Sequence, residues 1–504
     1  MEVTLDIRPN QEVEELVAGR DHAAAVASLR PILAPASVAV VGASRQPGSV
    51  GYGVLANIED ERFTGTVVPV NRSGGEVRSM RLVRGLAELD AVPELVIVAV
   101  PEAEVLGVAA EAAERGAKAL LVLSEGFVDD GEEGRARGER LLEVVRSAGL
   151  RMVGPGSLGV INTDPAVRLN ATVAAARVSR GRLAISSQSG AIGLGLLGHA
   201  AARRLGISSF ASLGDRADVS TNDLLEYWEE DDRTAAVVLY VESFGNPTRF
   251  ARIARRVARR KPLLAVKGRR LSPTGEPRSH TAAAARGGAV LGALLGHAGV
   301  LRFRGGDDLL NAAQFFEAQP LPRGRRIGIV SNSRGVADLA ADSGANSGLV
   351  VGELGAPTLA GLRRGLPGTH AANPVNVGHY GGPGEYATAL RALLADAGID
   401  AVIASHVGLS GGDPRAVLAA IGEAAAGQSK PVVASVVSAE GGLPEDGPAG
   451  VPNYLFPDAC AGVLVRAVER REWLSRPLGT SPRYLDLDPE AARALVAARL
   501  SDAP

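Results

Sequence analysis

Residues 40–53, VVGASRQPGSVGYG, join the end of an apolar strand to a glycine-rich turn and to the start of a helix. Four apolar runs follow, separated by segments long enough for helices: GTVVPV, ELVIVAVP, AKALLVLS and LRMVGP. Short apolar runs with this spacing are typical of parallel strands that helices cover on both faces of a sheet. The pattern predicts an α/β fold that begins with a doubly wound parallel sheet.

The same alternation restarts twice farther along the chain. GRLAISSQSGA opens a second series of apolar runs, and RRIGIVSNS opens a third after the proline-rich joint Gln319–Arg323. Residues 182–189 and 326–333 align at one fixed offset, so the second and third series are predicted to be copies of one unit. This organisation divides the chain into an N-terminal helical segment, three α/β domains and a C-terminal linker with an amphipathic helix, at residues 1–30, 31–150, 151–318, 319–476 and 477–504.

The composition narrows the class of protein. The 54 Lys and Arg residues nearly balance the 56 Asp and Glu residues, and only 4% of the 504 residues are aromatic, so neither charge nor stacking side chains point to nucleic acid. The single cysteine, Cys460, cannot form an internal disulfide, and no apolar run is long enough to cross a bilayer. The histidines show no metal-ligand spacing. These features predict a cytoplasmic protein with no metal site and no contact with nucleic acid or membrane.

The glycine-rich turn is a candidate cofactor site. Its glycines, Gly42 and Gly48 among them, would let backbone N–H groups approach a phosphate, to which the N-terminus of the following helix adds a favourable dipole. Asn71 and Arg72 follow the next strand, where an NAD-binding fold would carry an acidic residue. Arg72 together with Arg78 suits an additional phosphate, such as that of NADP or the 3′-phosphate of coenzyme A (CoA). A tight turn without any ligand is the remaining alternative.

Two serine-rich turns and one histidine are candidates for phosphate chemistry. Ser186–Ala191 (SSQSGA) leads from a strand into a helix and could hold an oxyanion, although such a serine is often only a helix cap. Its apparent copy at Ser331–Ser333 favours the binding role, because two helix N-termini that face each other would bind one dianion. His280 lies in a polar loop, where its imidazole could accept a phosphoryl group, and Glu242 follows another strand and could orient the ring.

Taken in order, these motifs closely resemble those of the NDP-forming acyl-CoA synthetases, the ADP-forming acetate–CoA ligases whose core is similar to the α subunit of succinyl-CoA synthetase. The resemblance covers roughly residues 30–475 and rests on the glycine-rich turn, GPGSLG, SSQSGA, DRADVSTNDLLEYWEED, LYVESFGNPTRFARIARRV, KPLLAVKGRR, RSHTAA and NPVN. It implies a Rossmann-like CoA-binding domain followed by two flavodoxin-like domains. It also implies the reversible conversion of acyl-CoA, phosphate and ADP into free acid, CoA and ATP, through an acyl phosphate and a phosphorylated histidine.

The resemblance also assigns roles to individual residues. His280 resembles the phosphorylated histidine, and Glu242 resembles the carboxylate that forms a hydrogen bond with it. The phosphate would be held at the two serine-rich turns, by Ser187, Gln188, Ser189, Gly190, Ser331, Asn332 and Ser333. CoA would contact the strand ends of the first domain at Gly42, Ser44, Gly48, Ser49, Asn71, Val100, Pro101, Ser124 and Glu125, with Arg72 beside them.

Several departures from the family pattern leave two functions open. Relatives usually carry GPNC where this chain has Gly154–Ser157 (GPGS), SHTGALAG where it has SHTAAAARG, and a Gly-Gly-Pro-Gly turn where it has Ser333–Val336. The residues after 476 are also too few for the ATP-grasp domain that phosphorylates the nucleotide in this family.

We therefore expect an α-type subunit of an ADP-forming acyl-CoA ligase. It would use ADP or ATP with Mg²⁺ only through a separate ATP-grasp β-type subunit, docked on the C-terminal helix in an oligomer. A CoA-binding scaffold or regulatory protein without catalysis is the alternative. An NADP-dependent oxidoreductase is a third hypothesis, because the glycine-rich turn alone is a weak motif.

Overall fold

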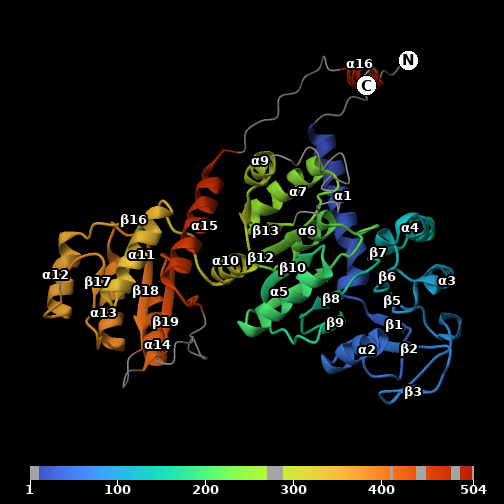
Figure 1. Cartoon of the computed structure of the whole chain (residues 1–504), viewed down its shortest axis with the longest axis horizontal. Coiled ribbons are helices and arrows are strands. Elements are labelled where there is room, and N and C mark those ends of the chain that lie inside the picture. The colour runs from blue at the N-terminus through green and yellow to red at the C-terminus, as the bar shows by residue number, and fades with distance from the viewer. Residues whose placement is uncertain are drawn as a thin grey trace, which may run out of the picture.

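The computed structural model describes residues 11–268, 288–369, 371–408, 413–438, 450–477 and 488–501. Three sheets with flanking helices follow one another along the chain, from the blue N-terminal part to the orange and red C-terminal part of Figure 1. The α/β fold with doubly wound sheets is confirmed.

The first sheet is fully parallel and has the order β2-β1-β5-β6-β7. Its central strands are continuous apolar runs with no exposed residue, as expected for strands that helices cover on both faces. The strands are β1 Ser37–Val41, β2 Thr66–Val70, β5 Leu95–Val98, β6 Ala119–Val122 and β7 Arg151–Val153. The associated elements are helices α1 Gln11–Leu33, α2 Val50–Asp60, α3 Glu102–Glu114 and α4 Gly131–Ser147, the 3₁₀ turns η1 Leu86–Glu88 and η2 Val128–Asp130, and the antiparallel pair β3 Glu76–Val77 and β4 Met80–Arg81.

The second sheet is mixed and has the order β14-β13-β12-β10-β11-β8-β9. From β10 onward its strands are parallel in the flavodoxin-like order 2-1-3-4-5, while β8 pairs antiparallel with both β11 and β9. Its strands are β8 Gly159–Asn162, β9 Leu169–Thr172, β10 Arg180–Ser187, β11 Ile207–Ser212, β12 Ala236–Val241, β13 Leu263–Lys267 and β14 Val300–Phe303. Its helices are α5 Gly190–Ala202, α6 Thr221–Glu230, α7 Pro247–Arg260, α9 Gly288–Ala298 and α10 Gly306–Ala318.

The third sheet is parallel and repeats the first four places of the same order, as β16-β15-β18-β19, with β17 also paired to β15. Its strands are β15 Arg326–Ser331, β16 Val350–Val351, β17 Val375–Asn376, β18 Ala401–Val407 and β19 Val432–Val437. The helices of this part of the chain are α11 Arg334–Asn346, α12 Ala356–Gly365, α13 Pro383–Ala395, α14 Pro414–Ala425, α15 Pro457–Ser475 and α16 Pro489–Ser501.

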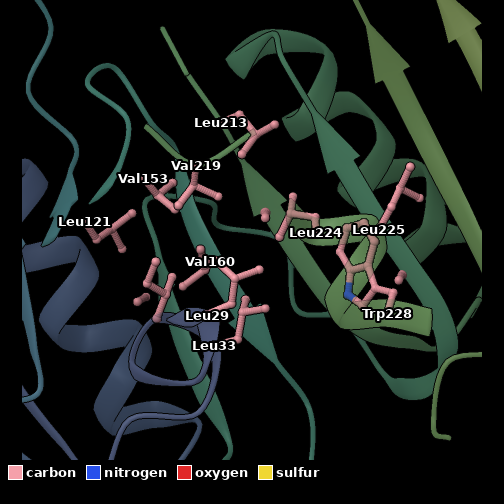
Figure 2. Packing of buried hydrophobic residues seen from close by; sticks show 14 of the residues in the cluster. Leu29, Leu33, Leu121, Val153, Val160, Leu213, Val219, Leu224, Leu225 and Trp228 are labelled. Atoms are coloured by element: carbon pink, nitrogen blue, oxygen red, sulfur yellow. The ribbon is translucent and has the colours of Figure 1, made fainter. Parts of the chain in front are cut away.

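Two apolar clusters hold the three sheets together. In the first, Leu29 and Leu33 of α1 share one cluster with Leu121 of the first sheet and Val160 of the second (Figure 2). The second cluster joins the second and third sheets through α10 and α15, which lie between the two sheets in Figure 1. Continuous cores of this kind fix the positions of the strand ends relative to one another.

None of the helices in the described ranges combines the length and the hydropathy that a bilayer span needs.

Candidate functional site

The glycine-rich turn after β1 packs so closely that two of its glycines are required. Gly42 has a φ of +93°, and a Cβ atom there would lie 2.2 Å from the carbonyl oxygen of Ala99 at the end of β5. A Cβ atom on Gly51, in the first turn of α2, would lie 2.1 Å from the carbonyl oxygen of Gly42. The turn, the end of β5 and the helix N-terminus are therefore in direct backbone contact, at the point where the strand order reverses.

Polar side chains fix the shape of this rim. Asn71 donates from Nδ2 to the carbonyl oxygen of Ala43 at 2.8 Å. Ser49 caps α2 by accepting the N–H of Tyr52, and the Oγ of Ser44 accepts the N–H of Gln46 at 3.0 Å. The other residues predicted to contact CoA lie at the carboxyl ends of the neighbouring strands. The hydroxyl group of Ser124 donates a hydrogen bond to the carbonyl oxygen of Val100 at 2.6 Å. Pro101 directly precedes α3, and Glu125 is exposed after β6.

The two predicted phosphate-binding arginines have different surroundings. Arg72 is 79% exposed and pairs with Glu104 at 3.1 Å, so it can turn toward a ligand on the rim. Arg78 pairs with Glu59 and with Asp60 Oδ1 at 2.8 Å, and the hydrogen bond to Glu59 raises its pKa. Arg78 therefore pairs with two carboxylates, and its action together with Arg72 on a phosphate stays a prediction.

The serine-rich turn after β10 is held by a side chain that we had expected to bind phosphate. Gln188 accepts the backbone N–H groups of Glu242 at 2.7 Å and of Ser243 at 2.9 Å, and its Nε2 donates to Thr221 Oγ1 and to the carbonyl oxygen of Ser243. Its amide thus links the ends of β10 and β12. Ser189 is the N-cap residue of α5 but makes no side-chain capping bond, and its N–H donates to Ser187 Oγ at 3.2 Å.

The turn after β15 repeats this arrangement. Asn332 accepts the N–H of Val407 and donates to its carbonyl oxygen, both at 3.0 Å, and so links the ends of β15 and β18. The N–H of Ser333 donates to Ser331 Oγ at 3.1 Å, and Ser333 also makes no side-chain capping bond to α11. In both turns the helix N-terminus has no serine side-chain cap. The amide side chain in the middle of each turn, Gln188 or Asn332, forms hydrogen bonds with a neighbouring strand end.

Glu242 lies partly buried directly after β12. Its carbonyl oxygen accepts Nζ of Lys267 at 2.5 Å, and burial lowers the pKa of this lysine. A Cβ atom on Gly268, which follows β13, would lie 3.5 Å from Cγ of Glu242. The chain therefore leaves β13 beside this carboxylate. His280 itself lies outside the described residues.

The turn at Asp215 and Arg216 connects the first and second sheets. The sequence motifs assign no role to these two residues. Asp215 donates its N–H to the carbonyl oxygen of Pro155 and accepts the N–H of Val128, while Arg216, with a φ of +55°, donates to the carbonyl oxygen of Ser243 at 2.9 Å. The N–H of Gly156 in turn donates to the carbonyl oxygen of Ser124. The sequence signal for this turn is a pair of charged residues three and four positions after the end of a buried strand.

The comparisons with known proteins agree with this geometry. Residues 36–163 match the family described as CoA binding domain, and residues 180–316 match the one described as Succinyl-CoA ligase like flavodoxin domain. The chain is 33% identical to the α subunit of ADP-forming acetate–CoA ligase II of Pyrococcus furiosus, over 73% of this chain and 80% of that one. The chain belongs to the family of ADP-forming acyl-CoA ligases.

Two further matches extend over most of this ligase-family chain. It is 29% identical to the α subunit of ligase I of the same organism, over 89% of this chain and 99% of that subunit. The solved structure of dinucleotide forming acetyl-coenzyme A synthetase 1 of Ca. Korarchaeum cryptofilum, in complex with phosphate and ADP, matches at 26% identity with a TM-score of 0.78, over 89% of this chain and 97% of that one. The chain spans 50% to 57% of the acetate–CoA ligases whose names carry no subunit label.

One cluster of potential metal ligands in this ligase chain escaped the sequence analysis. One potential ligand atom from each of His22, Glu226 and Glu229 lies within 4.8 Å of the other two, although His22 is 204 residues from Glu226 in the chain. Arg256 pairs with both carboxylates, with Glu229 at 2.7 Å, and lies 3.1 Å from His22 Nδ1. The cluster is therefore an ion-paired junction between α1, α6 and α7, in which Arg256 compensates part of the negative charge.

Proposed function

We propose that this chain is the α-type subunit of an ADP-forming acyl-CoA ligase, converting acyl-CoA, phosphate and ADP reversibly into free acid, CoA and ATP. The observation that carries the proposal is the turn at Asp215 and Arg216, which joins the rim of the CoA-binding sheet to the end of β12. A thioester bound on the first sheet would thus end beside Glu242 and the N-terminus of α5. Tight positioning of two reactants is the main requirement for this transfer.

CoA binds on the rim of the first sheet in this proposal. The backbone around Gly42–Ser49 and the N-terminus of α2 would receive its phosphates, with Arg72 swinging from Glu104. Val100, Pro101, Ser124 and Glu125 would line the path toward the second sheet. Asn71 would act by holding the turn in shape through Ala43.

The chemistry then proceeds in two transfers. Phosphate attacks the thioester carbonyl carbon, the carbon–sulfur bond breaks, and the products are an acyl phosphate and the CoA thiol. A ring nitrogen of His280 next attacks the phosphorus atom, the bond between phosphorus and the acyl oxygen breaks, and the free carboxylate leaves. Glu242 would accept a hydrogen bond from the other ring nitrogen. The hydroxyl group of Ser189, which makes no capping bond, and the N–H of Gly190 at the start of α5 would stabilise the phosphoryl oxygens.

The second serine-rich turn, Ser331–Ser333, would receive the phosphoryl group from the opposite side. It has the same backbone arrangement as the first turn and a helix N-terminus without a serine cap. Gln188 and Asn332 would support the two turns rather than touch the phosphate. The convergence of both helix N-termini on one group is part of the proposal.

The nucleotide step is assigned to a partner subunit. The match over 99% of an α subunit supports a heteromeric ligase in which an ATP-grasp β-type chain binds ADP and Mg²⁺. The exposed apolar residues Leu495 and Val496 of α16 are the proposed docking contacts for that chain. We also propose a cytoplasmic location, since the single cysteine, Cys460, is a buried free thiol.

Labelling of the purified chain tests the catalytic part of this proposal. With acetyl-CoA and radiolabelled phosphate, we expect an acid-labile, alkali-stable label on wild type even without a nucleotide-binding partner. His280→Asn should abolish the label, and Glu242→Gln should reduce it, while calorimetry shows unchanged CoA binding by both variants. A wild-type chain that binds CoA but takes up no label would identify the non-catalytic CoA-binding scaffold instead.

A further inference from the structure

A groove with a volume of about 330 Å³ lies between the end of α9, the start of β14 and the last turns of α15. It sits at the edge of the second sheet where the parallel strands begin, because Gly299 and Val300 line it and β14 starts at Val300. Ser187 and Glu242 lie at the opposite edge, where β10 and β12 end. The groove is therefore separate from the site proposed for acyl transfer.

The lining of the groove is strongly cationic. Its charged side chains are those of four arginines and one glutamate: Arg302, Arg466, Arg470, Arg476 and Glu469. The glutamate pairs with Arg466 at 2.7 Å. Within the described ranges, neither Arg470 nor Arg476 has a carboxylate partner. Arg470 and Arg476 therefore give the wall an excess of positive charge.

Arg470 is the feature that indicates a ligand. Only 4% of its surface is exposed, and its hydrogen bond goes from Nη1 to the carbonyl oxygen of Ala258 near the end of α7, at 2.9 Å. Burial lowers the pKa of Arg470 to about 10. The negative end of the α7 dipole compensates part of this charge, but a buried guanidinium has four further N–H groups that favour an oxyanion.

The groove selects for a small charged group rather than for an aromatic ring. Trp473 lines it, but the guanidinium of Arg259 lies 4.5 Å from the ring centre, and a Cβ atom on Gly299 would lie 2.4 Å from the ring. Contacts of this kind leave little room for a base to stack on the indole. Planar guanidinium groups, in contrast, match the oxygen geometry of phosphate.

We propose that this groove binds a phosphate-type oxyanion, either free inorganic phosphate or the phosphate group of a nucleotide, between Arg470 and the arginines at 302, 466 and 476. Arg470 supplies the buried charge, and Arg466 and Arg476 close over the anion from α15 and its end. The ligand is independent of the phosphate consumed in the reaction, because it occupies the other edge of the sheet.

Fluorine NMR on the full chain, labelled with 5-fluorotryptophan, tests the proposal directly. The chain has two tryptophans, and Trp228 is fully buried with its Nε1 bonded to Ser209 Oγ, so it is an internal reference for Trp473 in the groove. Sodium phosphate should shift the Trp473 resonance saturably and leave that of Trp228 unmoved. Sodium chloride at the same ionic strength should not reproduce the shift. A lower apparent Kd for ADP than for inorganic phosphate, with no shift by adenosine, would identify the phosphate group of a nucleotide as the ligand. A lower Kd for inorganic phosphate would identify the free anion.

Substitutions in the groove separate binding from a general salt effect. The double variant Arg466→Gln/Arg476→Gln should raise the apparent Kd for the anion at least tenfold. Arg471→Gln, which removes an exposed arginine of the same helix outside the groove, should bind as wild type does. Phosphohistidine labelling should persist in the double variant. An equal shift with chloride, equal binding by the double variant, or no shift with either phosphate or ADP would overturn the proposal and leave Arg470 as a cap of α7.

Discussion

At the scale of single residues, the two glycines of the first helix turn of α2 have opposite environments. Gly51 is buried, and its missing side chain lets the helix approach the carbonyl group of Gly42. Gly53, two residues later in the same helix, has no atom within 4 Å of the position that a Cβ would take. The same substitution therefore tests close approach at one position and helix propensity at the other.

Gly51→Ala should weaken CoA binding and lower the free energy of unfolding by about 1–3 kcal/mol, because backbone atoms must move apart. Gly53→Ala should keep CoA binding and raise the free energy of unfolding by up to about 1 kcal/mol, because alanine is the better helix former. Calorimetry with CoA and urea unfolding measure the two effects. Equal CoA affinities for both variants would show that the turn does not form the CoA site.

At the scale of elements, the second and third sheets each contain an amide side chain that links two strand ends. The amide of Gln188 links β10 to β12, and the amide of Asn332 links β15 to β18. In both sheets the linked strands flank the point where the strand order reverses. The amide thereby fixes the gap between two strand ends, which is where open α/β sheets bind their ligands.

Gln188→Ala should leave the N–H groups of Glu242 and Ser243 without their acceptor and lower the free energy of unfolding by about 1–3 kcal/mol. Because Glu242 is displaced, phosphohistidine labelling should fall by more than the loss of folded protein explains. Asn332→Ala should cost a similar free energy and serves as the matched variant in the third sheet. Full labelling of folded Gln188→Ala would mean that this amide does not position Glu242.

At the scale of the whole molecule, the first two sheets act as one body. Asp218, on the turn after β11, accepts Arg151 Nε and the backbone N–H of Met152, both at 2.8 Å, and so ties β7 to the second sheet. The shared core runs beneath this contact through α1 (Figure 2). In the proposed mechanism the thioester binds on the first sheet and the phosphate on the second, so acyl transfer would depend on this contact.

Asp218→Ala should lower the free energy of unfolding by about 1–3 kcal/mol and reduce labelling by acetyl-CoA while leaving CoA affinity unchanged. Glu472→Gln, which breaks the exposed pair with Arg325, should change stability by less than about 1 kcal/mol and leave labelling intact. Differential scanning calorimetry and labelling report both effects. A loss of CoA affinity in Asp218→Ala would place the defect in the first sheet itself.

The sequence alone determined the class of fold and the position of the turns. Buried parallel strands are continuous apolar runs, so β1, β5, β10 and β15 are visible without any partner strand. The duplication between β10 and β15, and the glycine at position 42, are equally local signals. The assignment of phosphate to the serine-rich turns came from the same local pattern and remains a prediction.

Only the tertiary structure decided which side chains are free to act. Gln188 and Asn332 accept hydrogen bonds from the neighbouring strand ends. Arg78 forms ion pairs with Glu59 and Asp60. Arg470 is buried without a carboxylate partner in the described part of the chain. The physical reason is separation along the chain: the partners of Gln188 and Asn332 lie up to 55 and 75 residues away. Apolar periodicity is a property of one segment, whereas hydrogen bonds and ion pairs depend on where whole sheets bring distant segments together.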